Sequence, residues 1–140
     1  MQGGYLLVET HPTHPGLVRI RTADQAPAGR AGGDQPRLRY AARFDDISAA
    51  QMHAHSQLRR GLVDVDSGLY RADPITAVAA AASIGLRHRQ IYLDPELASN
   101  PRLDAEIARR CARRQRISAI WDAVGIGALI FLLARLLLGF

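Results

Sequence analysis

The 140 residues suffice for one small domain, and 48% of them are hydrophobic, which allows a modest core. The single cysteine, Cys111, excludes an intramolecular disulfide and a thiolate metal cluster. The net charge of +5 is uneven, because residues 1–101 carry 11 Arg and 10 Asp or Glu, whereas residues 102–116 carry six Arg and two acids. The first hundred residues are therefore nearly neutral. Met1–Val8 lack the basic start and long apolar run of a secretory signal, so no export is expected.

Three strands are predicted in the first third of the chain. Tyr5–Glu9 and Leu17–Arg21 are short β-type segments, separated by a turn rich in His, Pro and Gly. Residues 23–36 contain three Gly and two Pro without apolar periodicity, which indicates a loop. Arg37–Phe44 alternates apolar and basic residues and is predicted to be the third strand.

Two helices are predicted next. Asp46 is a typical N-cap for a helix from Ile47 to about Leu62, whose apolar stripe would turn Gln51 inward. A short extended segment at Gly68–Arg71 follows. Asp73 and the proline after it then open an alanine-rich helix that runs to about Leu86.

These elements predict an α+β domain over residues 1–86, with helices flanking a three-stranded antiparallel sheet. Residues 87–99 are expected to be a linker. Residues 100–116 are predicted to form a basic juxtamembrane helix, with Asn100 as its N-cap and Pro101 as its first helical residue. Residues 117–140 are predicted to be a C-terminal transmembrane anchor.

The last 24 residues would form a helix about 36 Å long, enough to cross a hydrocarbon core of about 30 Å. Thirteen Leu, Ile, Val or Phe side chains, at roughly −0.3 to −0.6 kcal/mol each, outweigh about +3 kcal/mol for Arg135. Asp122 and Arg135 leave Ala123–Ala134 as the unbroken apolar run. Because runs of that length also occur in buried core helices, a helix buried in a soluble assembly is the rival interpretation.

The flanks of this helix predict its orientation. Trp121 stands where an interfacial aromatic side chain is expected, and the preceding arginines place the domain in the cytoplasm by the positive-inside rule. We expect a single-pass protein of a bacterial inner membrane, with these arginines on anionic lipid headgroups. The predicted membrane-interface residues are Arg109, Arg110, Arg113, Arg114, Arg116 and Trp121.

Arg135 is the unusual residue of the predicted span. It lies about 21 Å beyond Trp121 along a helix, short of the far interface. It could reach water by snorkelling, or it could face a polar group on a partner helix. Ala123 and Gly127, one helical turn apart, would allow such a helix to approach closely.

Four segments match a known pattern in order. Gly4–Glu9 reads GYLLVE and Pro15–Ile20 reads PGLVRI, while Gln51–Leu58 and Leu69–Pro74 supply a helix with a histidine and an aromatic strand that leads into a helix. Over about residues 3–85 this order resembles the GIY-YIG nuclease superfamily, in the branch with GYVY and LVKIG strands and an ERALH-like helix. The resemblance implies a small domain on a three-stranded antiparallel sheet, which in active members cleaves DNA with one divalent metal.

The resemblance also implies which residues would carry that chemistry. Active members use a first-strand tyrosine, an arginine that steadies the phosphate and a glutamate that holds the metal. Leu6 or Leu7 stands at the tyrosine position, and Gln51 replaces the glutamate, although a hard cation requires anionic oxygen. The vestigial candidates are Tyr5, Arg19, Arg30 and Gln51. A degraded site with no metal and no cofactor is therefore expected.

The spacing of the histidines does not predict a metal site. His53 and His55 would point about 200° apart on a helix, so one ion could not use both. His11 and His14 could approach each other in the turn, but no acid or thiol is nearby, which favours a surface loop.

The sequence thus favours a non-catalytic, membrane-anchored adaptor or accessory subunit of a larger membrane protein complex, with lipid and the subunits of that complex as partners. The alternative is a membrane-attached DNA-binding protein or a DNA endonuclease of the GIY-YIG type, although the nearly neutral domain does not favour nucleic acid. A third hypothesis is that a metal site persists at residues other than the usual ones and still supports metal-dependent nicking of DNA.

Overall fold

The computed structural model describes residues 2–28 and 34–139. The chain divides into two compact units, residues 1–107 and residues 108–140. The boundary between them falls inside the last helix, α4 (Pro101–Leu138). Arg30, a candidate from the sequence, lies outside the described residues.

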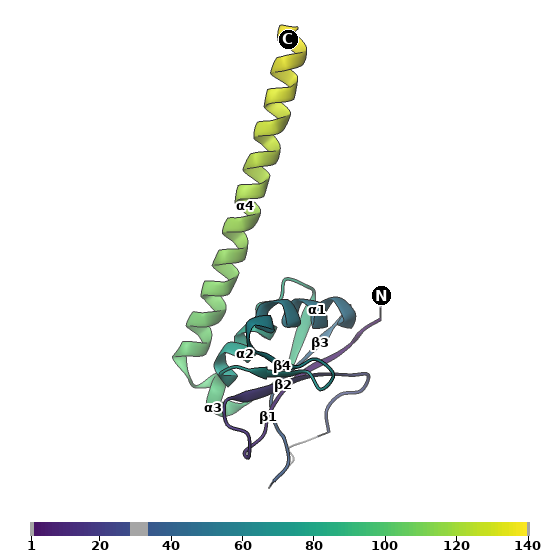
Figure 1. Ribbon diagram of the computed structural model, residues 1–140, viewed down its shortest axis with the longest axis vertical. Helices are drawn as coiled ribbons and strands as arrows, with labels where there is room; N and C mark the ends of the chain where they lie inside the picture. Colours follow the sequence, from purple (N-terminus) through teal and green to yellow (C-terminus); the bar gives the residue numbers. More distant parts are fainter. Residues whose placement is uncertain (1, 29–33, 140) are drawn as a thin grey trace. The chain divides into compact units, whose positions relative to one another are not determined.

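The first unit is an α+β domain built on one antiparallel sheet with the strand order β4-β5-β2-β1-β3-β6 (Figure 1). The strands are β1 (Gly4–Thr10), β2 (Leu17–Ala23), β3 (Arg37–Phe44), β4 (Leu62–Asp64), β5 (Leu69–Arg71) and β6 (His88–Leu93). The helices before α4 are α1 (Ile47–Leu58), the 3-10 turn η1 (Arg59–Gly61), α2 (Pro74–Ala82) and α3 (Pro95–Ala98).

The α+β class and the antiparallel sheet are confirmed, but the prediction of three strands was wrong, because the described sheet has six. The largest difference is β6, which lies in the stretch 87–99 that was expected to be a linker and pairs with β3. The sequence of β6 gives a weak strand signal, because its first half, His88 to Gln90, is polar and only its second half, Ile91 to Leu93, is apolar or aromatic. The first predicted helix stops at Leu58 instead of about Leu62, and the 3-10 turn η1 and the start of β4 follow in its place.

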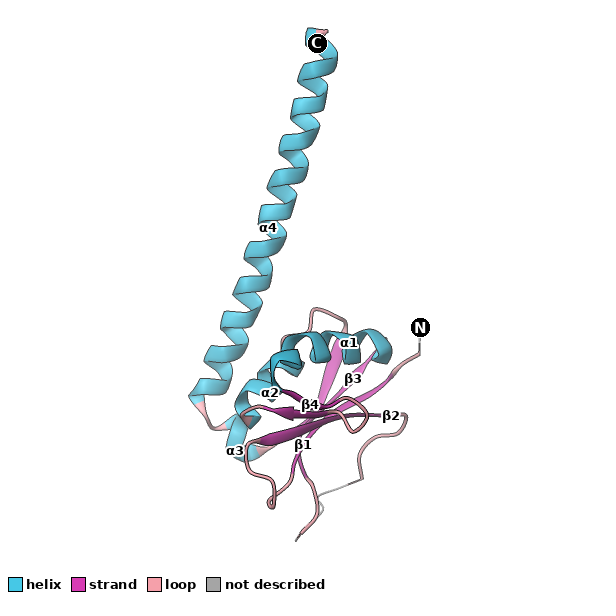
Figure 2. Cartoon of the chain, viewed as in Figure 1, coloured by secondary structure: helices cyan, strands magenta, loops and turns pink. Residues whose placement is uncertain are grey.

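Helices α1 and α2 cover one face of the sheet (Figures 1 and 2). Alternate strand residues point toward them, so that Leu6 and Val8 of β1 and Tyr40 of β3 belong to the same core. The helix α1 contributes Ala50, Ala54 and Leu58 to that core, as its apolar stripe predicts. Its N-cap is confirmed, because Asp46 Oδ1 accepts a hydrogen bond of 3.1 Å from the Ala49 amide.

Helix α2 is buried along nearly its whole length. Ile75 and all residues from Ala77 to Ala81 are buried, and α2 contacts α1, β1 and β3. Small alanine side chains allow this close approach on several sides. An apolar helix without a polar face is therefore stabilised here by its neighbours within the domain.

The domain core continues past the second predicted helix. Leu97 of α3 and Leu103 at the start of α4 are 6% and 2% exposed and belong to the core cluster, while Ile107 packs against it. The first turns of α4 are therefore part of the domain and complete its apolar core.

Two glycines allow strands to approach where a side chain would not fit. A Cβ on Gly61 would collide with the Arg71 carbonyl oxygen, and one on Gly68 would collide with the Ile20 carbonyl oxygen. Gly68 also has φ +64°, which other residues rarely adopt. These contacts fix the pairing of β4 and β5 with the rest of the sheet.

Candidate functional site

The second unit contains an apolar helical segment without cover from the protein. Helix α4 runs without a break to Leu138, so the predicted basic helix and the predicted anchor are one helix. Every residue from Ala112 to Leu133 is exposed. Among the described residues, α4 is the one helix long and apolar enough to span a membrane, and none of its most apolar 18-residue window is buried. A helix that is apolar on all sides requires an apolar surrounding.

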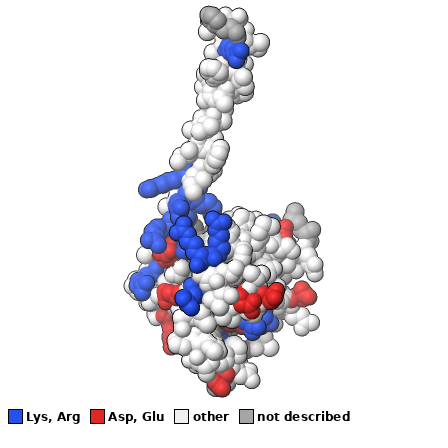
Figure 3. All heavy atoms as spheres, in the orientation of Figure 1, with Lys and Arg blue, Asp and Glu red and all other residues white. Residues whose placement is uncertain are grey.

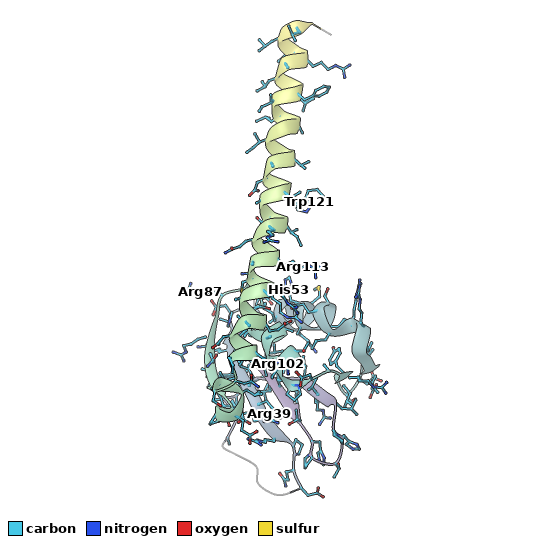
Figure 4. All side chains as sticks on the ribbon, turned by 90° about the vertical axis from the view of Figure 1, so that its left-hand side faces the viewer. Arg39, His53, Arg87, Arg102, Arg113 and Trp121 are labelled. Carbon is cyan, nitrogen blue, oxygen red and sulfur yellow. The ribbon has the colours of Figure 1, made fainter. Side chains whose placement is uncertain are left out.

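The predicted interface residues lie just before this apolar segment. In Figure 3 the arginines, drawn in blue, gather along the N-terminal part of α4, whereas the following part is almost entirely white. Arg113 and Trp121 both project outward from the helix (Figure 4). With about 100° per residue, Arg109, Arg113 and Arg116 share a sector of about 60°, and Arg110 and Arg114 share a second one. The five arginines together cover an arc of about 160°, so the segment before the exposed Trp121 is basic over roughly half of its circumference.

The residues predicted for a helix–helix contact are also on the surface of α4. Ala123 and Gly127 are exposed on neighbouring turns, and a Cβ on Gly127 would meet nothing within 4 Å. Arg135 lines a shallow groove of about 350 Å³ with Phe131, Ala134 and Leu138. These positions have the small and polar side chains that a second helix could contact.

The residues that the family resemblance singles out do not converge where the structure describes them. Tyr5 of β1 and Arg19 of β2 alternate with core residues and so lie on the sheet face opposite α1. The expectation that Gln51 points inward was wrong, because Gln51 is exposed. It follows Ala50 by about 100° around the helix, which moves it off the buried stripe. The sheet therefore separates Gln51 from the other two candidates.

The sheet face opposite the helices carries a set of residues that the sequence did not single out as a site. We call it the arginine face. Strand register places Tyr5 opposite Arg43, and Arg43 opposite Arg89. The next row contains Arg21, Leu7, Ala41 and Tyr92, and the third row pairs Arg19 with Glu9. The arginine face consists of Tyr5, Arg19, Arg21, Arg43, Arg89 and Tyr92 around the buried Leu7 and Ala41.

A buried ion-pair network lies where β6 passes into α3. The Asp94 side chain is fully buried, and its carboxylate lies 2.8 Å from Arg37 Nη2 and 3.0 Å from Arg39 Nη1. The Glu96 amide donates a 3.0 Å hydrogen bond to Asp94 Oδ1, which caps α3. Burial alone would raise the pKa of Asp94, but the hydrogen bonds from Glu96 and Arg39 and the charges of Arg37 and Arg39 outweigh it and lower that pKa.

The same arginines line a hollow at the end of the sheet. Arg37 and Arg39 contribute to a pocket of about 460 Å³ together with Thr10, His11 and His14. The two histidine rings lie 5.5 Å apart between their centroids. Within residues 2–28 and 34–139 no three His, Cys, Asp or Glu side chains come together as metal ligands. The acids Asp94 and Glu96 already neutralise the two arginines of this pocket.

The histidines of α1 have separate surroundings, as their spacing predicts. His53 is exposed, whereas His55 is half-buried and its Nδ1 lies 2.8 Å from the Tyr70 hydroxyl, which joins α1 to β5. The described residues thus offer two surfaces for function, the apolar part of α4 and the arginine face. No protein-family model, no curated protein and no solved structure matches this chain.

Proposed function

We propose that this chain is a non-catalytic, membrane-anchored adaptor, in which α4 crosses the bilayer once and the α+β domain serves as an accessory subunit of a larger membrane complex. The observation that carries the proposal is the exposed apolar segment of α4, next to a domain that has a complete core of its own. A domain with a buried core needs no second apolar element for stability. The segment therefore serves attachment.

The energetics favour lipid as the surrounding of this segment. Thirteen large apolar side chains between Ile117 and Phe140 contribute roughly −4 to −8 kcal/mol on insertion scales, and Arg135 opposes them by about 3 kcal/mol or less. In water the same side chains would remain exposed on all sides of an isolated helix. Insertion removes that exposure without any further protein.

The basic segment favours the orientation. Five arginines between Arg109 and Arg116 directly precede the span, and the positive-inside rule retains such a cluster in the cytoplasm. Each arginine near an anionic leaflet contributes about 1 kcal/mol of attraction. We therefore place the domain on the cytoplasmic side of a bacterial inner membrane, with Trp121 at the headgroup level.

The absence of catalysis in this proposal follows from the positions of the vestigial residues. If the chain is a degenerate relative of the GIY-YIG nucleases, as four of its segments suggest, Gln51 has replaced the carboxylate that would hold the metal. Gln51 also lies on α1, away from Tyr5 and Arg19 on the other face of the sheet. An adaptor role requires none of these groups to converge.

Alkaline carbonate extraction of membranes tests the anchor. We expect the full chain to stay in the membrane pellet, and a chain that ends at Ile107 to be released. Release of the full chain by carbonate would favour the rival interpretation, an apolar helix buried in a soluble assembly.

The single cysteine provides a test of orientation. In a bacterial host, a membrane-impermeant maleimide should label Cys111 in inverted vesicles but not in spheroplasts. Cys111 is half-buried and can therefore react slowly with the maleimide. A second variant places a cysteine on the exposed surface of the domain, Gln25→Cys in a Cys111→Ser background, and should also be labelled in inverted vesicles but not in spheroplasts. Leu138→Cys in that background should show the opposite pattern. Labelling of Gln25→Cys in spheroplasts would reverse the proposed orientation.

Purification in mild detergent tests the adaptor role. We expect the chain to co-elute in a fixed ratio with integral membrane proteins, and chemical crosslinks from its domain to those proteins. Recovery of the chain only as a solitary monomer, in two detergents and without crosslinks, would contradict an accessory subunit.

A further inference from the structure

We propose that the arginine face is the docking surface of the domain and that it binds an acidic, extended segment of a partner protein. This inference rests on the proposed adaptor function and specifies the chemistry of the partner. It draws on three observations: the alignment of the arginines across the strands, the arrangement of the ion pairs elsewhere in the domain, and the charge of the domain as a whole.

The alignment concentrates positive charge at one end of the face. Arg43 of β3 and Arg89 of β6 are exposed cross-strand neighbours, and Tyr5 is the next residue in the same row. Like charges placed directly opposite each other destabilise a sheet. A carboxylate between the two guanidinium groups would convert this repulsion into two charge-assisted hydrogen bonds.

Among the described residues, four other arginines of the domain lie in ion pairs with acids. Arg21 Nη2 lies 2.8 Å from Glu9 Oε1, and Arg87 Nε lies 3.6 Å from Asp45 Oδ2. Arg37 and Arg39 share Asp94 and Glu96. Over residues 2–28 and 34–139, by contrast, the ion pairs of the domain include neither Arg43 nor Arg89. Arg43 and Arg89, which face each other across two strands, therefore have no carboxylate partner among the described residues, in contrast to Arg21, Arg37 and Arg39 of the same sheet.

The half-buried tyrosines add a contact area for a peptide. Tyr5 and Tyr92 lie in adjacent rows of the face, beside Arg43 and Arg89. Tyrosine offers a rigid apolar ring and a hydroxyl group, a combination enriched at protein interfaces. In an extended segment alternate side chains point to one side and recur about every 7 Å. An extended acidic segment would therefore present several carboxylates to the face, one of which could lie between Arg43 and Arg89.

The nearly neutral net charge of the domain favours an acidic protein, rather than a nucleic acid, as its binding partner. Residues 1–101 carry 11 Arg against 10 Asp or Glu, so the domain lacks the broad positive field typical of nucleic-acid-binding domains. Glu9, 9% exposed, lies in the third row and would repel a continuous phosphate backbone. A short acidic segment needs only the local charge around Arg43 and Arg89.

The test uses the full chain in nanodiscs of neutral phosphatidylcholine, so that anchoring is verified by co-elution with the disc before binding is measured. The probe is a fluorescein-labelled ten-residue peptide that alternates Glu and Val, compared with a peptide carrying Gln in place of Glu and with a ten-nucleotide single-stranded DNA. Fluorescence anisotropy gives each dissociation constant. We expect the Glu peptide to bind at least tenfold more tightly than the Gln peptide.

Charge reversal locates the surface. Arg43→Glu together with Arg89→Glu should weaken binding of the Glu peptide about tenfold or more. The matched control, Arg59→Glu with Arg60→Glu, changes two exposed arginines of η1 by the same charge and should alter binding less than twofold. Thermal melts check that both variants are folded.

Two results would overturn the proposal. One is equal weakening by both variants, or no preference for the Glu peptide, since the arginine face would then have no special role. The other is tighter binding of the single-stranded DNA that is lost on reversal of Arg43 and Arg89, which would assign the face to nucleic acid. Either result leaves the anchor and the adaptor function intact, because co-elution with nanodiscs and with membrane proteins is measured separately.

Discussion

Helix α2 and the segment Ala123–Ala134 of α4 both consist almost entirely of apolar residues, yet they have opposite surroundings. In α2 all residues from Ala77 to Ala81 are buried against α1 and the sheet. In α4 all residues from Ala112 to Leu133 are exposed. The side chains differ in the same direction, since α2 uses alanine, which allows close protein packing, and α4 uses Leu, Ile and Phe, which partition strongly into lipid. The comparison shows that side-chain size, as well as hydropathy, indicates the medium for which a helix is suited.

The largest expected effect comes from charges in the middle of the α4 segment. Leu129→Arg with Leu133→Arg adds about 6 kcal/mol or more against insertion, which approaches or exceeds the whole favourable term. We expect this variant to move from the membrane pellet to the supernatant in carbonate extraction. Arg135→Leu is the control and should remain fully in the pellet. Retention of the double-arginine variant would show that α4 is held by protein rather than by lipid.

The corresponding change in α2 should unfold the domain and leave the anchor in place. Ala79 is 0% exposed, so Ala79→Asp buries an unpaired carboxylate, which we expect to cost about 4 kcal/mol or more. Limited proteolysis in detergent should then degrade the domain while carbonate extraction still finds the chain in the pellet. Thr76→Asp, in the first turn of the same helix, should be tolerated because an acid there favours the helix dipole. Protease resistance of the Ala79 variant would mean that α2 is less enclosed than described.

A smaller effect is expected at the buried acid that joins β6 and α3 to the sheet. Asp94→Asn keeps the size of the side chain but leaves the Arg37 and Arg39 charges without their buried partner, at a cost of about 3 kcal/mol. The folded pKa of Asp94 lies below its ordinary value of 3.8, so its contribution is present above about pH 4 and is lost as the pH falls through the folded pKa. Denaturant melts at pH 7 and pH 3 should therefore differ less for the variant than for the natural chain. An equal pH dependence would assign the acid sensitivity to other carboxylates.

The smallest expected effect is a gain. The Tyr40 hydroxyl is buried and has no hydrogen-bond partner among the described residues, so Tyr40→Phe should stabilise the domain by up to about 1 kcal/mol. Burial also raises the pKa of Tyr40 to about 12, from an ordinary value of 10.0. The natural chain should therefore lose stability as the pH rises from about 10 to 12, relative to the Phe variant. A destabilised Phe variant would point to a polar partner for this hydroxyl.

The elements predicted well from the sequence are those with a strong local signal. The three long strands lie within two residues of their predicted starts and ends, and the cap at Asp46 and the proline at Pro74 mark the starts of α1 and α2, although the Asp73 side chain makes no capping hydrogen bond. The apolar segment of α4 was equally clear, because its length and composition are properties of consecutive residues. Local propensity, capping and hydropathy were sufficient for these.

The elements missed depend on contacts between residues far apart in the chain. Strand β6 is stabilised by pairing with β3, whose residues precede their partners by 44 to 53 positions, and Asp94 is buried where it meets Arg37 and Arg39 of β3. The arginine face was missed for the same reason, since Arg43 and Arg89 become neighbours only through the strand register. Register is not encoded in any one segment, and so the candidate site could not be composed from motifs alone.

The burial of Leu103 and Ile107 decides where the chain can be cut for work in solution. A fragment that ends at residue 99, the natural choice if residues 87–99 were a linker, would lack both side chains and leave a gap in the apolar core. Such a fragment should aggregate for reasons unrelated to the anchor. A soluble domain for crystallisation or spectroscopy should instead keep the first two turns of α4 and stop after Ile107, before the basic segment begins.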